Sequence, residues 1–166
     1  GKLDESGYHL EQAFKLMPEA PVVANNLAWH LVYQDPPEID RAMKLISLVI
    51  DKHPNVPAYI DTRGHVYLKM KEWRKAIDDF EISLRQFANE PSVHAGLAEA
   101  YENLQMTELA TRHRAISEKL EEEQKSQKMV FTISRERQEA ERKKIEAKGI
   151  SDFQKIISET INPNLL

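Results

Sequence analysis

The hydrophobic and polar positions between Pro57 and Phe80 follow the pattern of a helix, a short break and a second helix. Gly64 lies in the middle of the first predicted helix, where glycine costs about 1 kcal/mol relative to alanine. A glycine at such a position needs a structural reason, and a repeat in the sequence supplies one.

The same pattern recurs with a period of 34 residues. Three pairs of identical residues lie 34 positions apart: Pro57 and Pro91, Tyr67 and Tyr101, and Ala76 and Ala110. A fixed period of this length is typical of a repeat architecture. It divides the chain into three units, 21–56, 57–90 and 91–124, preceded by a half unit over 1–20 that matches only the second helix of a unit.

A 34-residue helix–turn–helix unit with small residues at Gly64, Ala76 and Ala110 resembles the tetratricopeptide repeat. The resemblance implies an all-α solenoid of about three and a half repeats, in which stacked units bury one continuous core. In that family a small residue stands where the two helices of a unit cross, and Gly64 falls on that position. Without a Cβ, one helix can approach its partner closely, and the packing offsets the loss in helix propensity.

The resemblance also implies that the first helix of each unit lines a concave face, which binds an extended peptide or a partner helix. The matching positions are Asn25, Asn26, Trp29, Tyr33, Asp61, His65, Lys69, Glu99, Glu102 and Asn103. Trp29 and Tyr33 stand out, because large aromatic side chains one turn apart are favoured contact residues. Two alternatives stay open: the aromatic residues pack between units, and the charged ones are ordinary solvated surface.

Some tetratricopeptide proteins grip a C-terminal carboxylate with lysine, arginine and asparagine side chains. Asn26 matches this arrangement, whereas Thr62 and Gly96 occupy the equivalent positions of the next units. Lys69 is the only cation expected on the face. The sequence therefore argues against a carboxylate clamp.

The composition changes after Ile116. From Glu118 to Lys148, 17 of 31 residues are charged, and no proline or glycine interrupts the run. This predicts a long, solvent-exposed helix over 116–148 that continues from the last repeat and contains pairs of opposite charge four residues apart. After Gly149, we expect a short amphipathic helix over 150–161 that begins at Ser151 as its N-cap.

Several apolar side chains of this C-terminal half have no partner in the neighbouring sequence. They are Met129, Val130, Phe131, Phe153, Ile156, Ile157 and Ile161. Four of these, on the short helix, would supply enough driving force for association, so the sequence predicts a homo-oligomer formed through the tail. The competing possibility is that the chain folds back at Gly149 and the short helix covers residues 129–131.

Residues 136–156 read ERQEAERKKIEAKGISDFQKI. This run is similar to the C-terminal helical region of bacterial prohibitin-like proteins, of the stomatin–prohibitin–flotillin group. The resemblance implies self-association through residues 116–161, near a membrane supplied by segments outside this chain.

The sequence lacks several common catalytic motifs. The chain has no cysteine, and its six histidines lack the spacing of a helical zinc site. Neither a glycine-rich phosphate loop nor a nucleophile elbow is present. We therefore expect no catalytic residue, no metal and no cofactor.

Two classes of partner are also disfavoured. The net charge is −4, and glutamates interleave the basic residues between 135 and 144, which argues against nucleic-acid binding. No apolar run approaches the length of a membrane span, so we expect no direct membrane insertion by this segment.

The sequence thus favours a non-enzymatic scaffold that binds a protein or peptide on its repeats. One alternative is an assembly segment of a prohibitin-like membrane scaffold. Another is a substrate-recruiting segment of a larger enzyme. The compartment stays open between the cytoplasm and a membrane reached through other segments.

Overall fold

The computed structural model describes residues 2–160, and every regular element in that range is an α-helix. The helices are α1 (Lys2–Leu16), α2 (Pro21–Tyr33), α3 (Ile39–Lys52), α4 (Pro57–Lys69), α5 (Trp73–Leu84), α6 (Pro91–Asn103) and α7 (Thr107–Thr160). The all-α prediction is confirmed. None of the described helices is long and apolar enough to cross a membrane.

The helix starts repeat along the chain. Helices α2, α4 and α6 each begin with a proline, which suits the first helical position because its missing N–H has no partner there in any case. These three helices are the first helices of the three units.

The turns inside the second and third units repeat as well. Lys71 and Gln105, 34 residues apart, both have positive φ angles, of 62° and 61°. In each turn the next residue donates a backbone hydrogen bond to the tyrosine carbonyl five positions earlier, Glu72 to Tyr67 and Met106 to Tyr101. This is the hydrogen bond of a Schellman cap.

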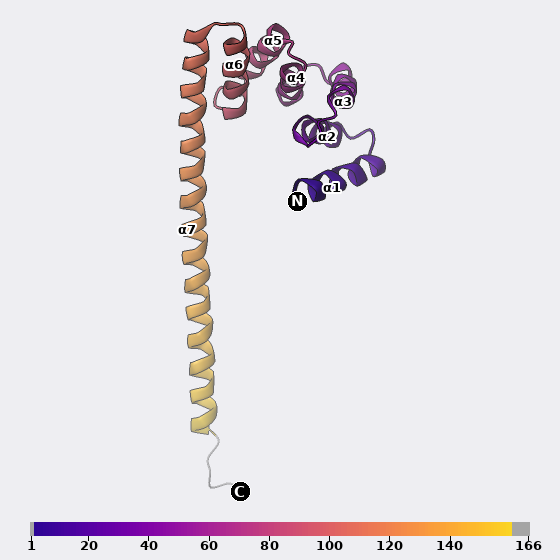
Figure 1. Ribbon diagram of the computed structural model, residues 1–166. Coiled ribbons are helices and arrows are strands. Elements are labelled where there is room, and N and C mark those ends of the chain that lie inside the picture. The colour runs from indigo at the N-terminus through magenta and orange to yellow at the C-terminus, as the bar shows by residue number, and fades with distance from the viewer. Residues whose placement is uncertain (1, 161–166) are drawn as a thin grey trace. The chain divides into compact units, whose positions relative to one another are not determined.

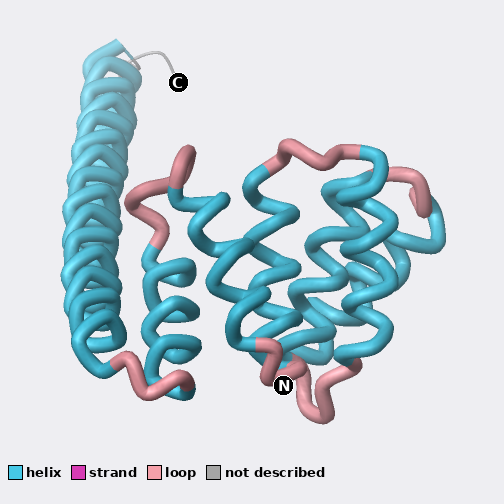
Figure 2. Tube along the Cα trace, turned by 90° about the horizontal axis from the view of Figure 1, so that it is seen from above, coloured by secondary structure: helices cyan, strands magenta, loops and turns pink. Residues whose placement is uncertain are grey.

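The helices form two layers within residues 1–121, which make one compact unit. Consecutive helices from α1 to α6 lie side by side, as Figure 1 and Figure 2 show. Helices α2, α4 and α6 also contact one another in order, so they form a layer of their own. We call the side of this layer that carries Asn25, Trp29 and Asp61 the inner face.

Residues 122–160 form a second unit, made entirely of the remainder of α7. Helix α7 continues through Gly149, so the expected break there and the separate short helix over 150–161 are wrong. Glycine keeps its backbone N–H and lowers helix propensity by only about 1 kcal/mol, which the long helix tolerates. Ile161 lies outside the described residues.

Candidate functional site

Three of the predicted binding residues form an aromatic cluster on the inner face. Trp29 and Tyr33 lie one turn apart on α2, with ring centroids 4.9 Å apart, and Trp29 meets the edge of His65 from α4 at 4.7 Å. The Tyr33 hydroxyl lies 2.6 Å from Nδ1 of His65. Lys69 adds its ammonium 5.3 Å from the centre of the Tyr33 ring. The structure therefore brings four predicted residues from two units together.

His65 lies deeper than a surface contact residue. Its side chain is 4% exposed, and its ring also packs against Phe80 of α5 at 4.8 Å. Tyr33 stays 42% exposed, and Trp29 is half-buried. The two rings therefore pack against the neighbouring unit and keep part of their surface accessible, and a contact with a partner stays a prediction.

A hollow of about 360 Å³ opens beside this cluster. Its lining residues are Asn25, Asn26, Trp29, Ala58, Asp61, Thr62, Ser83, Phe87, Glu90 and Ser92. Four buried polar atoms in or beside it have no hydrogen-bond partner: Asn25 Oδ1, Asp61 Oδ1, His65 Nε2 and Ser83 Oγ. Buried polar groups in native proteins are nearly always paired, so such a cluster requires an explanation.

The electrostatics of the hollow are set by carboxylates. Burial raises the pKa of the Tyr33 hydroxyl, and the nearby charges of Asp61 and Glu99 raise it further. Tyr33 therefore keeps its proton and can donate it to Nδ1 of His65. In neutral His65 the ring proton is then on Nε2, which lies 3.5 Å from Asp61 Oδ1. That distance is too long for a good hydrogen bond.

The predicted residues on α6 do not line this hollow, although the charge of Glu99 reaches Tyr33. Glu99 and Glu102 line a second hollow together with Arg114, Ser117, Glu118 and Glu121 of α7. Glu102 pairs with Arg114 at 2.6 Å. The Asn103 side-chain amide donates to the Glu99 carbonyl of its own helix at 2.9 Å. The ten predicted residues thus divide into a group on α2 and α4 and a group on α6.

Sequence reasoning missed Ser83, Phe87 and Glu90 as lining residues. They come from the end of α5 and the turn before α6, rather than from the first helix of a unit. A periodic pattern assigns residues to the faces of helices. It does not predict which residues of a turn line a hollow of the neighbouring unit.

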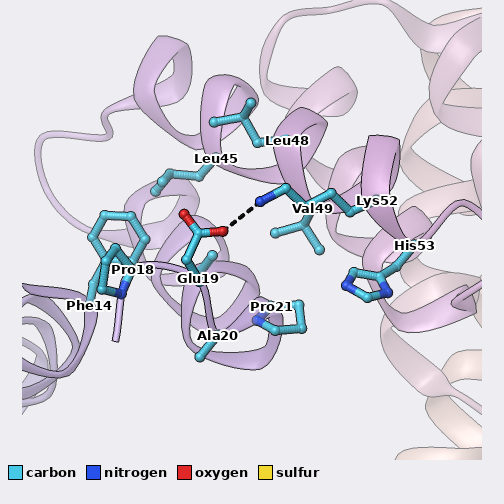
Figure 3. Close-up of a pocket in the computed structure, with 11 residues that line it drawn as sticks. Phe14, Pro18, Glu19, Ala20, Pro21, Leu45, Leu48, Val49, Lys52 and His53 are labelled. Atoms are coloured by element: carbon cyan, nitrogen blue, oxygen red, sulfur yellow. Dashed lines mark hydrogen bonds and ion pairs between the residues drawn. The ribbon is translucent and has the colours of Figure 1, made fainter. Parts of the chain in front are cut away.

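A separate apolar pocket of about 190 Å³ lies between the α1–α2 turn and α3 (Figure 3). Phe14, Leu45, Leu48 and Val49 supply much of its wall. Lys52 and Glu19 form an ion pair of 2.6 Å beside it, and the lysine lowers the pKa of the glutamate. No pattern in the sequence indicated this pocket.

The predicted self-association residues are exposed within the second unit. They are Met129, Val130, Phe131, Phe153, Ile156 and Ile157, each with 43–69% of its surface accessible. Every described residue from 122 to 160 is exposed. Among the described residues, no group of three or more histidine, cysteine, aspartate or glutamate side chains could hold a metal ion.

Comparisons with solved structures bear on the fold. MamA of strain MSR-1, in crystal form C2, is 27% identical, with a TM-score of 0.55 over 75% of this chain and 70% of that one. MamA of strain AMB-1 is also 27% identical, with a TM-score of 0.56 over 74% and 71%. MamA of Desulfovibrio magneticus RS-1, from residue 41 to its end, is 16% identical, with a TM-score of 0.58 over 75% and 69%.

The chain has a tetratricopeptide-type fold. The likeness to the MamA structures and the seven described helices agree on this. No family model and no curated protein matches the chain. The resemblance of residues 136–156 to prohibitin-like proteins stays a prediction.

Proposed function

We propose that this chain is a non-catalytic interaction scaffold that binds an extended peptide or a helix on its inner face. The observation that carries the proposal is the position of Trp29 and Tyr33 beside a hollow with unpaired buried polar atoms. Tryptophan and tyrosine side chains at pockets are enriched among the residues that contribute most of the binding energy of protein interfaces. The similarity in fold to MamA supports a repeat scaffold without naming its partner.

The test uses a displayed library of random 12-residue peptides, selected on the full-length protein. We expect the selected peptides to lose most of their affinity when Trp29→Ala and Tyr33→Ala are combined, because hot-spot truncations cost about 2 kcal/mol or more. Circular dichroism of the variant should show unchanged helix content.

Leu48→Ala is the matched control, because Leu48 is exposed and lines the pocket of Figure 3 instead of the inner face. If the aromatic substitutions leave the affinity of the peptides unchanged and Leu48→Ala lowers it, the binding site is that pocket. If neither set of substitutions lowers the affinity of the peptides, the inner face is not their binding surface.

We further propose that the second unit mediates self-association. Its apolar side chains are exposed, and those of Phe131 and Phe153 are more than 60% exposed. A second copy of the same helix is the simplest partner, because it offers the same apolar positions and the same alternation of charge. This arrangement would place several inner faces in one assembly and raise the avidity for a partner with repeated motifs.

A further inference from the structure

Two unpaired hydrogen-bond acceptors line the hollow on the inner face. Asn25 Oδ1 and Asp61 Oδ1 are buried without a partner, and an amide or carboxylate oxygen can only accept. Ser83 Oγ, fully buried, is also unpartnered, and it lines the hollow together with them. His65 Nε2 lies 3.5 Å from Asp61 Oδ1, which is too far for a good hydrogen bond. The two oxygens therefore lack a well-placed donor.

The missing donor should also be positively charged. Asp61 and Glu90 line the hollow, and none of its lining residues is a lysine or an arginine. The cations on α4 are engaged elsewhere. Arg63 makes a bidentate ion pair with Asp79, and Lys69 lies over the Tyr33 ring.

The hollow also offers an aromatic wall. Trp29 is half-buried and lines it, and indole is the best of the aromatic partners for a cation. A carboxylate or phosphate would face Asp61 and Glu90 and be repelled. A neutral amide could donate to Asn25 but would leave the charge of Asp61 uncompensated.

We propose that this hollow binds a lysine or arginine side chain of a partner peptide, with Asn25, Asp61 and Ser83 as hydrogen-bond partners and Trp29 against the aliphatic stem and charged group. The proposal rests on peptide binding by the inner face. It adds the chemistry of the partner, a basic residue in the bound segment.

The test titrates the full-length protein with single amino acids blocked at both ends and follows them by NMR. The probes are Nα-acetyl-lysine amide and Nα-acetyl-arginine amide, with the glutamine analogue as the neutral control and the glutamate analogue as the anionic one. The resonances to follow are the indole N–H of Trp29 and the side-chain amide of Asn25. We expect saturable shifts with the two cationic probes, at Kd values about tenfold below that of the glutamine probe, as charge-assisted hydrogen bonds require. The lysine and arginine arms show which cation fits better.

Asp61→Asn should weaken the cationic probes about tenfold, because the side chain keeps its shape and loses its charge. Asp78→Asn is the matched control, since Asp78 is exposed on α5 and does not line the hollow, and it should leave both Kd values within about twofold. If Asp61→Asn fails to fold, Glu90→Gln replaces it. Glu90 is exposed in the turn before α6, and its removal should weaken the cationic probes alone.

Absence of saturable shifts, equal binding of the glutamine probe, or indifference to Asp61→Asn would overturn the proposal. The peptides selected from the displayed library distinguish a failure of the cation site from a failure of peptide binding by the inner face. Peptides that depend on Trp29 and Tyr33 but contain no preferred basic residue would retain the peptide-binding surface and remove only the cation site.

Discussion

The ring of Phe80 in α5 lies directly against the backbone of Gly64 in α4. A Cβ added to Gly64 would come within 2.7 Å of Phe80 Cε1, a distance that real Cβ contacts do not show. The same ring meets Gly96 of α6, where a Cβ would come within 2.5 Å of Cζ. One fully buried phenylalanine thus occupies the space left by two glycines on neighbouring first helices.

Gly64→Leu should destabilise the protein by roughly 1–3 kcal/mol or more, because an overpacked core forces side chains and backbone to move. Urea unfolding followed by circular dichroism measures the change in the free energy of unfolding. An unchanged midpoint would refute the packing role of this glycine.

Gly149→Ala is the matched control. Gly149 is also inside a helix, but a Cβ there meets nothing within 4 Å. We expect no loss of stability and a gain in the helicity of α7, since alanine is favoured over glycine by about 1 kcal/mol.

Substitutions of Arg63 in α4 and Asp79 in α5, which form an ion pair, should have strongly non-additive effects on the free energy of unfolding. Arg63 donates to both carboxylate oxygens, at 2.7 and 2.8 Å, and the Asp79 side chain is only 5% exposed. Arg63→Met leaves a buried carboxylate without its partner, which typically costs about 3–5 kcal/mol. Thermal unfolding at pH 7.5 measures the loss. Combining Arg63→Met with Asp79→Leu should restore most of it, because no buried charge then remains unpaired.

The loss caused by Arg63→Met should depend on pH. Burial raises the pKa of Asp79, and the guanidinium of Arg63 opposes that rise. Without Arg63 the carboxyl binds a proton more readily, so the variant loses stability as pH rises through the raised pKa. We expect a smaller gap from the parent protein at pH 4.5 than at pH 7.5. A gap of equal size at both values would contradict this account.

His113 should make the last repeat sensitive to acid. Its ring stacks on His94 with Nδ1 atoms 2.9 Å apart, and burial, followed by the charges of His94 and Arg112, lowers its pKa from 6.5. Below pH 6.5 the unfolded chain therefore binds more protons than the folded one at this site, and stability falls as the pH is lowered. Melting temperatures at pH 7.5 and 5.0 should differ less in His113→Gln than in the parent. His9→Gln, at an exposed histidine, should keep the parent's difference.

Self-association should require the C-terminal part of α7. Phe153 and Ile157 lie one turn apart and are exposed, and burying a side chain of this size contributes roughly 1.5–3 kcal/mol. Sedimentation of the full chain should show a dimer or larger species, and both Phe153→Ser with Ile157→Ser and a version ending at Glu123 should shift it to monomer. If all three proteins sediment as monomers at high concentration, the prediction of self-association is wrong.

The sequence determined the repeat and the helices that build it. Proline, tyrosine and alanine at a 34-residue period mark where each unit begins and where its two helices cross, and such local signals need no knowledge of distant contacts. The same logic failed at Gly149, because a glycine lowers helix propensity without forcing a helix to end, and α7 continues through it.

Only the tertiary structure decided what fills the space around each small residue and which polar groups remain unpaired. The period places Gly64 on a crossing but does not say that the ring of Phe80 reaches both Gly64 and Gly96. Likewise, the period places Asn25 and Asp61 on one face but does not indicate that Ser83 joins them from the end of α5. Apart from that between Phe80 and Gly64, these relationships join residues of different units, and their geometry depends on how far each unit rotates on the next, which no local pattern encodes.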